Sequence, residues 1–113
     1  MPIAIQPLTA DIAVAGQLAP EAMVDAAAAG FRSVINNRPD FEGGPTQPTS
    51  ASIEAAAQAA GLTYAFLPVA SGYQSPDEIA RFSTLLETMP RPILAFCRSG
   101  ARSGKLVRAA LAA

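Results

Sequence analysis

Short apolar runs alternate along this chain with alanine-rich or amphipathic segments, and this alternation constrains the fold more than any other feature. Four runs are predicted as strands, at residues 11–15, 31–35, 62–67 and 93–96. Helices are predicted between and after them, at residues 20–29, 50–60, 75–89 and from about 102 onward. Strands that alternate with helices predict an α/β fold with a mostly parallel central sheet of four to five strands, flanked by helices and joined by right-handed crossovers.

Local signals support these boundaries. Ser75 can accept a hydrogen bond at the start of the third helix, and Glu78 completes a capping box three residues later. Gly30 and Gly61 stand where the first two helices should stop, because glycine readily adopts the left-handed conformation that ends a helix. Residues 93–96 are continuously apolar, which is typical of a strand buried on both faces of a parallel sheet.

Composition excludes several classes of protein. The 113 residues are half hydrophobic, which fits one domain, residues 1–113, with a real core. A single cysteine cannot form an internal disulfide, and neither a secretory signal nor an apolar run of about 20 residues is present, so we expect a soluble, cytoplasmic protein that does not enter a membrane. The absence of histidine excludes Cys/His dyads, Ser/His/Asp triads and histidine metal sites. A net charge of −1 gives no reason to expect a nucleic-acid partner.

The chemistry is expected in the segment Cys97-Arg98-Ser99-Gly100-Ala101-Arg102-Ser103, which follows the last strand. Its backbone N–H groups, the N-terminus of the next helix and the Arg102 guanidinium should together form an anion-binding cradle. Arginines and a helix N-terminus can lower a cysteine pKa from about 8.5 to roughly 3.5–7.5. We therefore predict Cys97 as a thiolate nucleophile, with Arg102 and Ser103 as catalytic partners. The anion-binding residues would be Arg98, Ser99, Gly100 and Ala101.

A second candidate segment is the loop of residues 36–48, which is dense in glycine and proline and long for a compact domain. We expect it to form the rim of the site, with Arg38 and Asp40 as substrate-binding residues. Asp40 is also a candidate substitute for a general acid. In the alternative interpretation, both side chains only stabilise a turn.

Three motifs resemble a known family, the phosphatase-like domain of the beta-lactamase-hydrolase-like proteins. They are residues 30–40, the Pro68-Val69 pair followed by the Ser75-Pro76 helix start, and residues 92–103. The resemblance implies a fold similar to dual-specificity phosphatases, with Cys97 as the nucleophile and the loop from Cys97 to Arg102 as the anion cradle. Because some relatives are fused to or encoded near sulfide- and persulfide-oxidising enzymes, it also implies an association with such enzymes.

Two departures from the phosphatase pattern favour sulfur transfer. Arg102 follows Cys97 by five positions, which resembles rhodanese-type sulfurtransferases, whereas cysteine phosphatases place the arginine six positions on. Dual-specificity phosphatases also carry a general-acid Asp where this chain has Pro68-Val69-Ala70-Ser71-Gly72. Such an acid is worth roughly 10²–10⁴ in rate for ester cleavage, whereas transfer of sulfane sulfur between thiolates needs none.

These observations make a sulfurtransferase that works through a Cys97 persulfide the leading hypothesis. The alternative is a protein tyrosine or dual-specificity-like phosphatase, a hydrolase with a phosphocysteine intermediate. A third hypothesis is a module that binds an anion or a partner without catalysis. The expected substrate is a small anion or thiol: a persulfide, thiosulfate or a phosphoester. No metal and no cofactor is expected, and no oligomeric state is predicted.

Overall fold

The computed structural model describes residues 3–112 and contains one five-stranded sheet. In chain order the strands are β1 (Ile5–Pro7), β2 (Ile12–Ala15), β3 (Ser33–Asn36), β4 (Thr63–Phe66) and β5 (Ile93–Phe96). Their order across the sheet is β1-β2-β5-β3-β4, and all neighbours are parallel except β1 and β2. The predicted α/β class and the mostly parallel sheet are therefore confirmed.

Strand β1 has no counterpart among the predicted strands. It is three residues long, exposed throughout, and pairs antiparallel with β2 at the edge of the sheet. Because none of its side chains is buried, its sequence has no need of the apolar pattern that predicts the other four strands.

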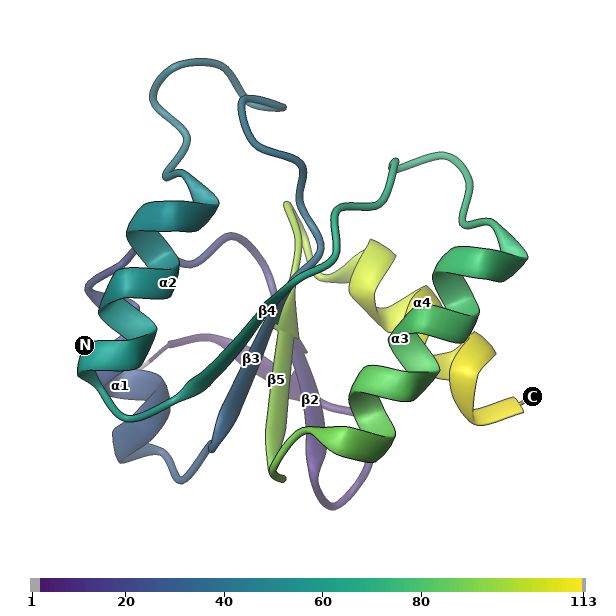
Figure 1. Cartoon of the computed structure of the whole chain (residues 1–113), viewed down its shortest axis with the longest axis horizontal. Helices are drawn as coiled ribbons and strands as arrows, with labels where there is room; N and C mark the ends of the chain where they lie inside the picture. Colours follow the sequence, from purple (N-terminus) through teal and green to yellow (C-terminus); the bar gives the residue numbers. More distant parts are fainter. Residues whose placement is uncertain (1–2, 113) are drawn as a thin grey trace.

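Four helices cover the sheet, two on each face (Figure 1). They are α1 (Ala22–Ala28), α2 (Ser50–Ala59), α3 (Pro76–Thr88) and α4 (Ala101–Ala112). Helices α1 and α2 lie on one face of the sheet, and α3 and α4 lie on the other (Figure 1). The predicted capping box of α3 is confirmed, because the Glu78 N–H donates to Ser75 Oγ at 3.1 Å and the Ser75 N–H donates to Glu78 Oε1 at 2.8 Å. Helix α1 begins two residues later than predicted and has no side-chain cap.

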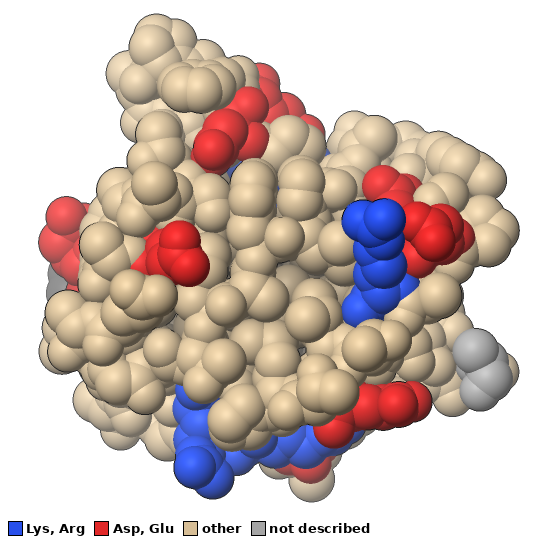
Figure 2. All heavy atoms as spheres, viewed as in Figure 1, with Lys and Arg blue, Asp and Glu red and all other residues tan. Residues whose placement is uncertain are grey.

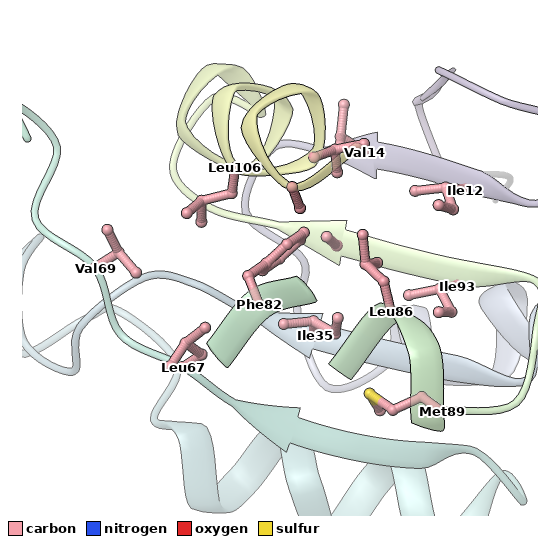
Figure 3. Close-up of a cluster of buried hydrophobic side chains, with 13 residues drawn as sticks. Ile12, Val14, Ile35, Leu67, Val69, Phe82, Leu86, Met89, Ile93 and Leu106 are labelled. Atoms are coloured by element: carbon pink, nitrogen blue, oxygen red, sulfur yellow. The ribbon is translucent and has the colours of Figure 1, made fainter. Parts of the chain in front are cut away.

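Strand β5 is buried at all four positions and contributes side chains to the apolar clusters on both faces of the sheet. Ile93 and Ala95 belong to the apolar cluster between the sheet and helices α3 and α4, which Figure 3 shows packed around Phe82. Leu94 and Phe96 belong to the cluster under α1 and α2. Full burial of each large side chain stabilises the fold by about 1.5–3 kcal/mol. The residue that follows β5 is therefore attached to a strand that is packed on both faces of the sheet.

The four parallel strands end at the same edge of the sheet. The loops after β3, β4 and β5 all extend from this edge, at the top of Figure 1. In open parallel sheets this is the edge where ligands bind. On the face shown in Figure 2, acidic and basic side chains are scattered between larger uncharged areas. No helix within residues 3–112 is both long and apolar enough to cross a bilayer.

Candidate active site

Cys97 directly follows β5 and lines a surface cavity of about 590 Å³. Only 1% of the residue is exposed, yet it contributes to the cavity wall. The sulfur accepts a hydrogen bond from the Gly100 backbone N–H at 3.1 Å. The cavity is lined by Arg38, Glu42, Gly43, Ser71, Cys97, Arg98, Ser99, Ala101, Arg102 and Lys105.

The loop that follows Cys97 is held against the end of β2 by backbone contacts. The Gln17 N–H donates to the Arg98 carbonyl at 3.1 Å. Gly100 has a φ of +92°, which a residue with a side chain would adopt only under strain. At Gly16 a Cβ atom would lie 3.2 Å from the Arg98 carbonyl oxygen, so the two segments approach as closely as they do because neither glycine has a side chain. Helix α4 then begins at Ala101, with its N-terminus beside the cavity.

Two opposing effects act on the pKa of Cys97. Burial raises it, because a buried thiolate loses its hydration. Hydrogen bonds from the Ser103 backbone and hydroxyl, and from the backbones of Ser99 and Gly100, lower it. The hydrogen bonds prevail, so the pKa of Cys97 is lowered from its ordinary value. This is the direction expected from the sequence.

Ser103 sits between the sulfur and Asn37. Its hydroxyl donates to Asn37 Oδ1 at 2.8 Å, and Asn37 Nδ2 in turn donates to the Leu67 carbonyl at 3.0 Å. Ser103 and Asn37 are both fully buried. The hydroxyl has one proton and two acceptors, the Asn37 oxygen and the sulfur, so Asn37 competes with the thiolate for that proton.

Arg102 is 6% exposed and binds a carboxylate through both ends of its guanidinium. Its Nη1 donates to Glu42 Oε2 at 3.1 Å and its Nη2 donates to Glu42 Oε1 at 3.0 Å. Nη1 also donates to the Val69 carbonyl at 2.9 Å. The Nε atom is buried and has no hydrogen-bond partner. These three hydrogen bonds use three of the five N–H groups of the guanidinium, and the Nε–H is one of the two that remain for a ligand.

Arg38 binds the same carboxylate. Its Nε donates to Glu42 Oε1 at 3.0 Å, and its Nη1 donates to Gln17 Oε1 at 3.0 Å. The hydrogen bond from Arg102, opposed by burial and supported by Arg38, holds the pKa of Glu42 below its usual 4.5. No role for Glu42 or Gln17 follows from the sequence; for Glu42 the only signal is its place in the loop of residues 36–48.

The structure brings nearly all of the predicted site residues together. Six of them line the cavity: Arg38, Cys97, Arg98, Ser99, Ala101 and Arg102. Gly100 and Ser103 act on the sulfur through hydrogen bonds. Asp40 does not join them, because its Oδ1 accepts the Ser50 N–H at 2.7 Å, at the start of α2, and it does not line the cavity. Asp40 therefore lies outside this group of residues, and its role in substrate binding or as an acid stays a prediction. Residues 3–112 contain no group of three or more His, Cys, Asp or Glu side chains suited to a metal ion.

Comparisons with known proteins show which family this chain belongs to. The model of the family described as "Beta-lactamase hydrolase-like protein, phosphatase-like domain" matches residues 4–113. A beta-lactamase hydrolase-like protein of Xylella fastidiosa is 37% identical over 92 residues, which are 81% of this chain and 21% of that protein. This chain thus spans about a fifth of the length of the curated relatives it matches.

Solved structures share the fold. The crystal structure of a candidate phosphatase from Neisseria meningitidis matches with a TM-score of 0.84 and 30% identity, over 91% of this chain and 72% of that one. A candidate phosphatase from Shewanella putrefaciens, 19% identical, matches with a TM-score of 0.77 over 95% of this chain and 67% of that one, and shows the fold alone. With a family model that matches residues 4–113, this chain belongs to the phosphatase-like domain family of the beta-lactamase hydrolase-like proteins.

Proposed function

We propose that this domain is a cysteine-dependent phosphatase that cleaves phosphate compounds through a phosphocysteine intermediate. The observation that carries the proposal is the buried, unpartnered Nε of Arg102, in a loop whose backbone N–H groups surround Cys97 Sγ. A buried N–H of a charged guanidinium without an acceptor is costly, and an oxygen of a bound anion removes that cost.

The reaction runs in two steps. The Cys97 thiolate attacks phosphorus, and the bond to the leaving oxygen breaks with its electron pair going to that oxygen. Water then attacks the phosphocysteine, and the electron pair of the S–P bond returns to sulfur. In both steps the N–H groups of the loop and Arg102 stabilise the charge on the phosphoryl oxygens. The lowered pKa of Cys97 favours the anion that begins the first step and ends the second.

The family and its solved relatives support hydrolysis of phosphate over transfer of sulfur. The family is described as phosphatase-like, and the Neisseria protein, 30% identical, is a candidate phosphatase. The phosphatase hypothesis therefore ranks above the sulfurtransferase hypothesis, which is the reverse of the order that the sequence alone favours. The short spacing from Cys97 to Arg102 is present within this family match, so it does not by itself indicate a sulfurtransferase.

The test is hydrolysis of p-nitrophenyl phosphate by the purified domain and by its Cys97→Ser variant. We expect release of p-nitrophenol that is lost in the variant, and a phosphorylated Cys97 in acid-quenched samples analysed by mass spectrometry. A parallel assay with thiosulfate and cyanide detects sulfur transfer as thiocyanate. Cys97-dependent thiocyanate formation without hydrolysis of phosphate would overturn the proposal.

A further inference from the structure

The cavity offers no carboxylic acid that could protonate a leaving group. Among the residues that line it, Glu42 is the one carboxyl group. Three hydrogen bonds from Arg38 and Arg102 occupy its two oxygens, which holds it as a carboxylate. Asp40 is turned to the backbone of Ser50 instead. Within residues 3–112, no carboxylic acid is therefore placed to protonate the leaving group.

This absence restricts the substrate. Loss of general-acid catalysis costs roughly 10²–10⁴ in rate where the departing oxygen is a strong base such as an alkoxide. A weakly basic leaving group departs as a stable anion and needs no proton. Without an acid, phosphate esters with strongly basic leaving groups are poor substrates. Compounds with weakly basic leaving groups are therefore favoured.

The charges of the cavity fall into an inner and an outer set. Inside, two arginines share one carboxylate, which leaves a single formal positive charge to face the Cys97 thiolate. Outside, Arg98 and Lys105 line the same cavity, are exposed, and form no ion pair with any acidic residue of the described chain. Lys105 lies one helical turn after Ala101, which also lines the cavity. Two uncompensated cations therefore border the space above the sulfur.

We propose that the substrate is a phosphoanhydride, and that Arg98 and Lys105 bind the leaving phosphate group. This inference rests on the proposed phosphatase activity and names its substrate class. Cys97 attacks the terminal phosphorus, the S–P bond forms, and the bond from that phosphorus to the bridging oxygen breaks. The electron pair stays on the bridging oxygen, which leaves as part of a phosphate anion with no proton added. A phosphate leaving group is weakly basic, so it needs no acid, and it is negatively charged, so it can bind the two exposed cations.

The experiment compares three probes: inorganic pyrophosphate, p-nitrophenyl phosphate and glycerol 3-phosphate. Pyrophosphate and the nitrophenyl ester both have weakly basic leaving groups, but only that of pyrophosphate is a phosphate. Glycerol 3-phosphate has a strongly basic one. We expect kcat/KM for glycerol 3-phosphate to be at least about a hundredfold below that for p-nitrophenyl phosphate. The double variant Arg98→Ala, Lys105→Ala should lower the ratio of kcat/KM for pyrophosphate to that for p-nitrophenyl phosphate about tenfold, since each exposed ion pair is worth up to about fivefold.

Arg108→Ala is the matched control, because Arg108 is an exposed cation on α4 that does not line the cavity, and it should leave the ratio unchanged. An unchanged ratio in the double variant would overturn the role of Arg98 and Lys105. Comparable hydrolysis of glycerol 3-phosphate and p-nitrophenyl phosphate would overturn the inference from the missing acid. Absence of Cys97-dependent hydrolysis of all three probes would instead overturn the phosphatase proposal itself.

Discussion

Substitution of Glu42 by alanine tests how the two buried arginines are compensated. In the wild type, this one carboxylate forms ion pairs with both Arg38 and Arg102, whose side chains are only 10% and 6% exposed. The variant leaves two largely buried guanidinium groups without a counter-ion. We therefore expect it to be less stable than the wild type, and to recover stability when an inorganic anion takes the place of the carboxylate.

The size of the effect follows from burial. Removal of one partner from a buried ion pair costs about 3–5 kcal/mol, and from an exposed pair about 0.2–1 kcal/mol. The Glu42 side chain is 27% exposed, so we expect a loss of about 2 kcal/mol, near the middle of this range. For a chain of this size that loss lowers Tm by roughly 8 °C. Phosphate at about a hundred times its Kd returns about 2.7 kcal/mol, enough to offset the loss.

The assay is thermal unfolding at increasing phosphate concentration, with Glu54→Ala as the control. Glu54 is an exposed acid on α2, so its loss changes net charge equally without uncovering an arginine. Because the pKa of Glu42 is lower in the folded protein than its ordinary 4.5, its stabilising contribution is complete above that value and is lost as pH falls through the folded-state pKa. The gap between wild type and variant should therefore close in acid. A Glu42→Ala protein with wild-type Tm, or one that gains no more from phosphate than the control, would refute the reasoning.

Three further substitutions have defined outcomes. Arg102→Lys should lower kcat/KM at least about a hundredfold with p-nitrophenyl phosphate, because a lysine cannot supply both the carboxylate contacts and the free Nε–H; near-wild-type turnover would exclude that role. Ser103→Ala should slow iodoacetamide labelling of Cys97 at pH 6.5 by about fivefold, the worth of one hydrogen bond, and an unchanged rate would mean that Asn37 keeps the hydroxyl proton. Phe82→Ala should cost about 3–5 kcal/mol in urea unfolding, since this side chain is fully buried in the cluster of Figure 3.

The fold was readable from the sequence wherever burial imposes a pattern. The apolar run of β5 and the Ser75 capping box predict their elements because each reflects a local physical requirement, burial on two faces or satisfaction of free N–H groups. Strand β1 carries no such pattern, because it buries nothing and depends on its pairing with β2.

The site was predictable only in its contiguous part. Residues 97–103 form one continuous segment, a loop followed by the first turn of α4, so their chemistry is visible in the order of residues. The Glu42 carboxylate reaches Arg102 across 60 positions of sequence, and Asn37 reaches Ser103 across 66, through contacts that only the packed sheet creates. Asp40 shows the opposite case. It is an acidic residue in the predicted rim loop, but its carboxylate accepts a backbone hydrogen bond at the start of α2.

The reaction requires Cys97, the one cysteine of the chain, to be an anion, and the pH dependence of its alkylation tests this most directly. Iodoacetamide reacts with the thiolate, so the rate of labelling, followed by mass spectrometry, titrates the thiol in the folded protein. We expect the midpoint in the folded protein to lie below the midpoint of the same cysteine in denaturant. A midpoint in the folded protein at or above that in denaturant, or a cysteine that reacts only after unfolding, would contradict a stabilised thiolate at Cys97.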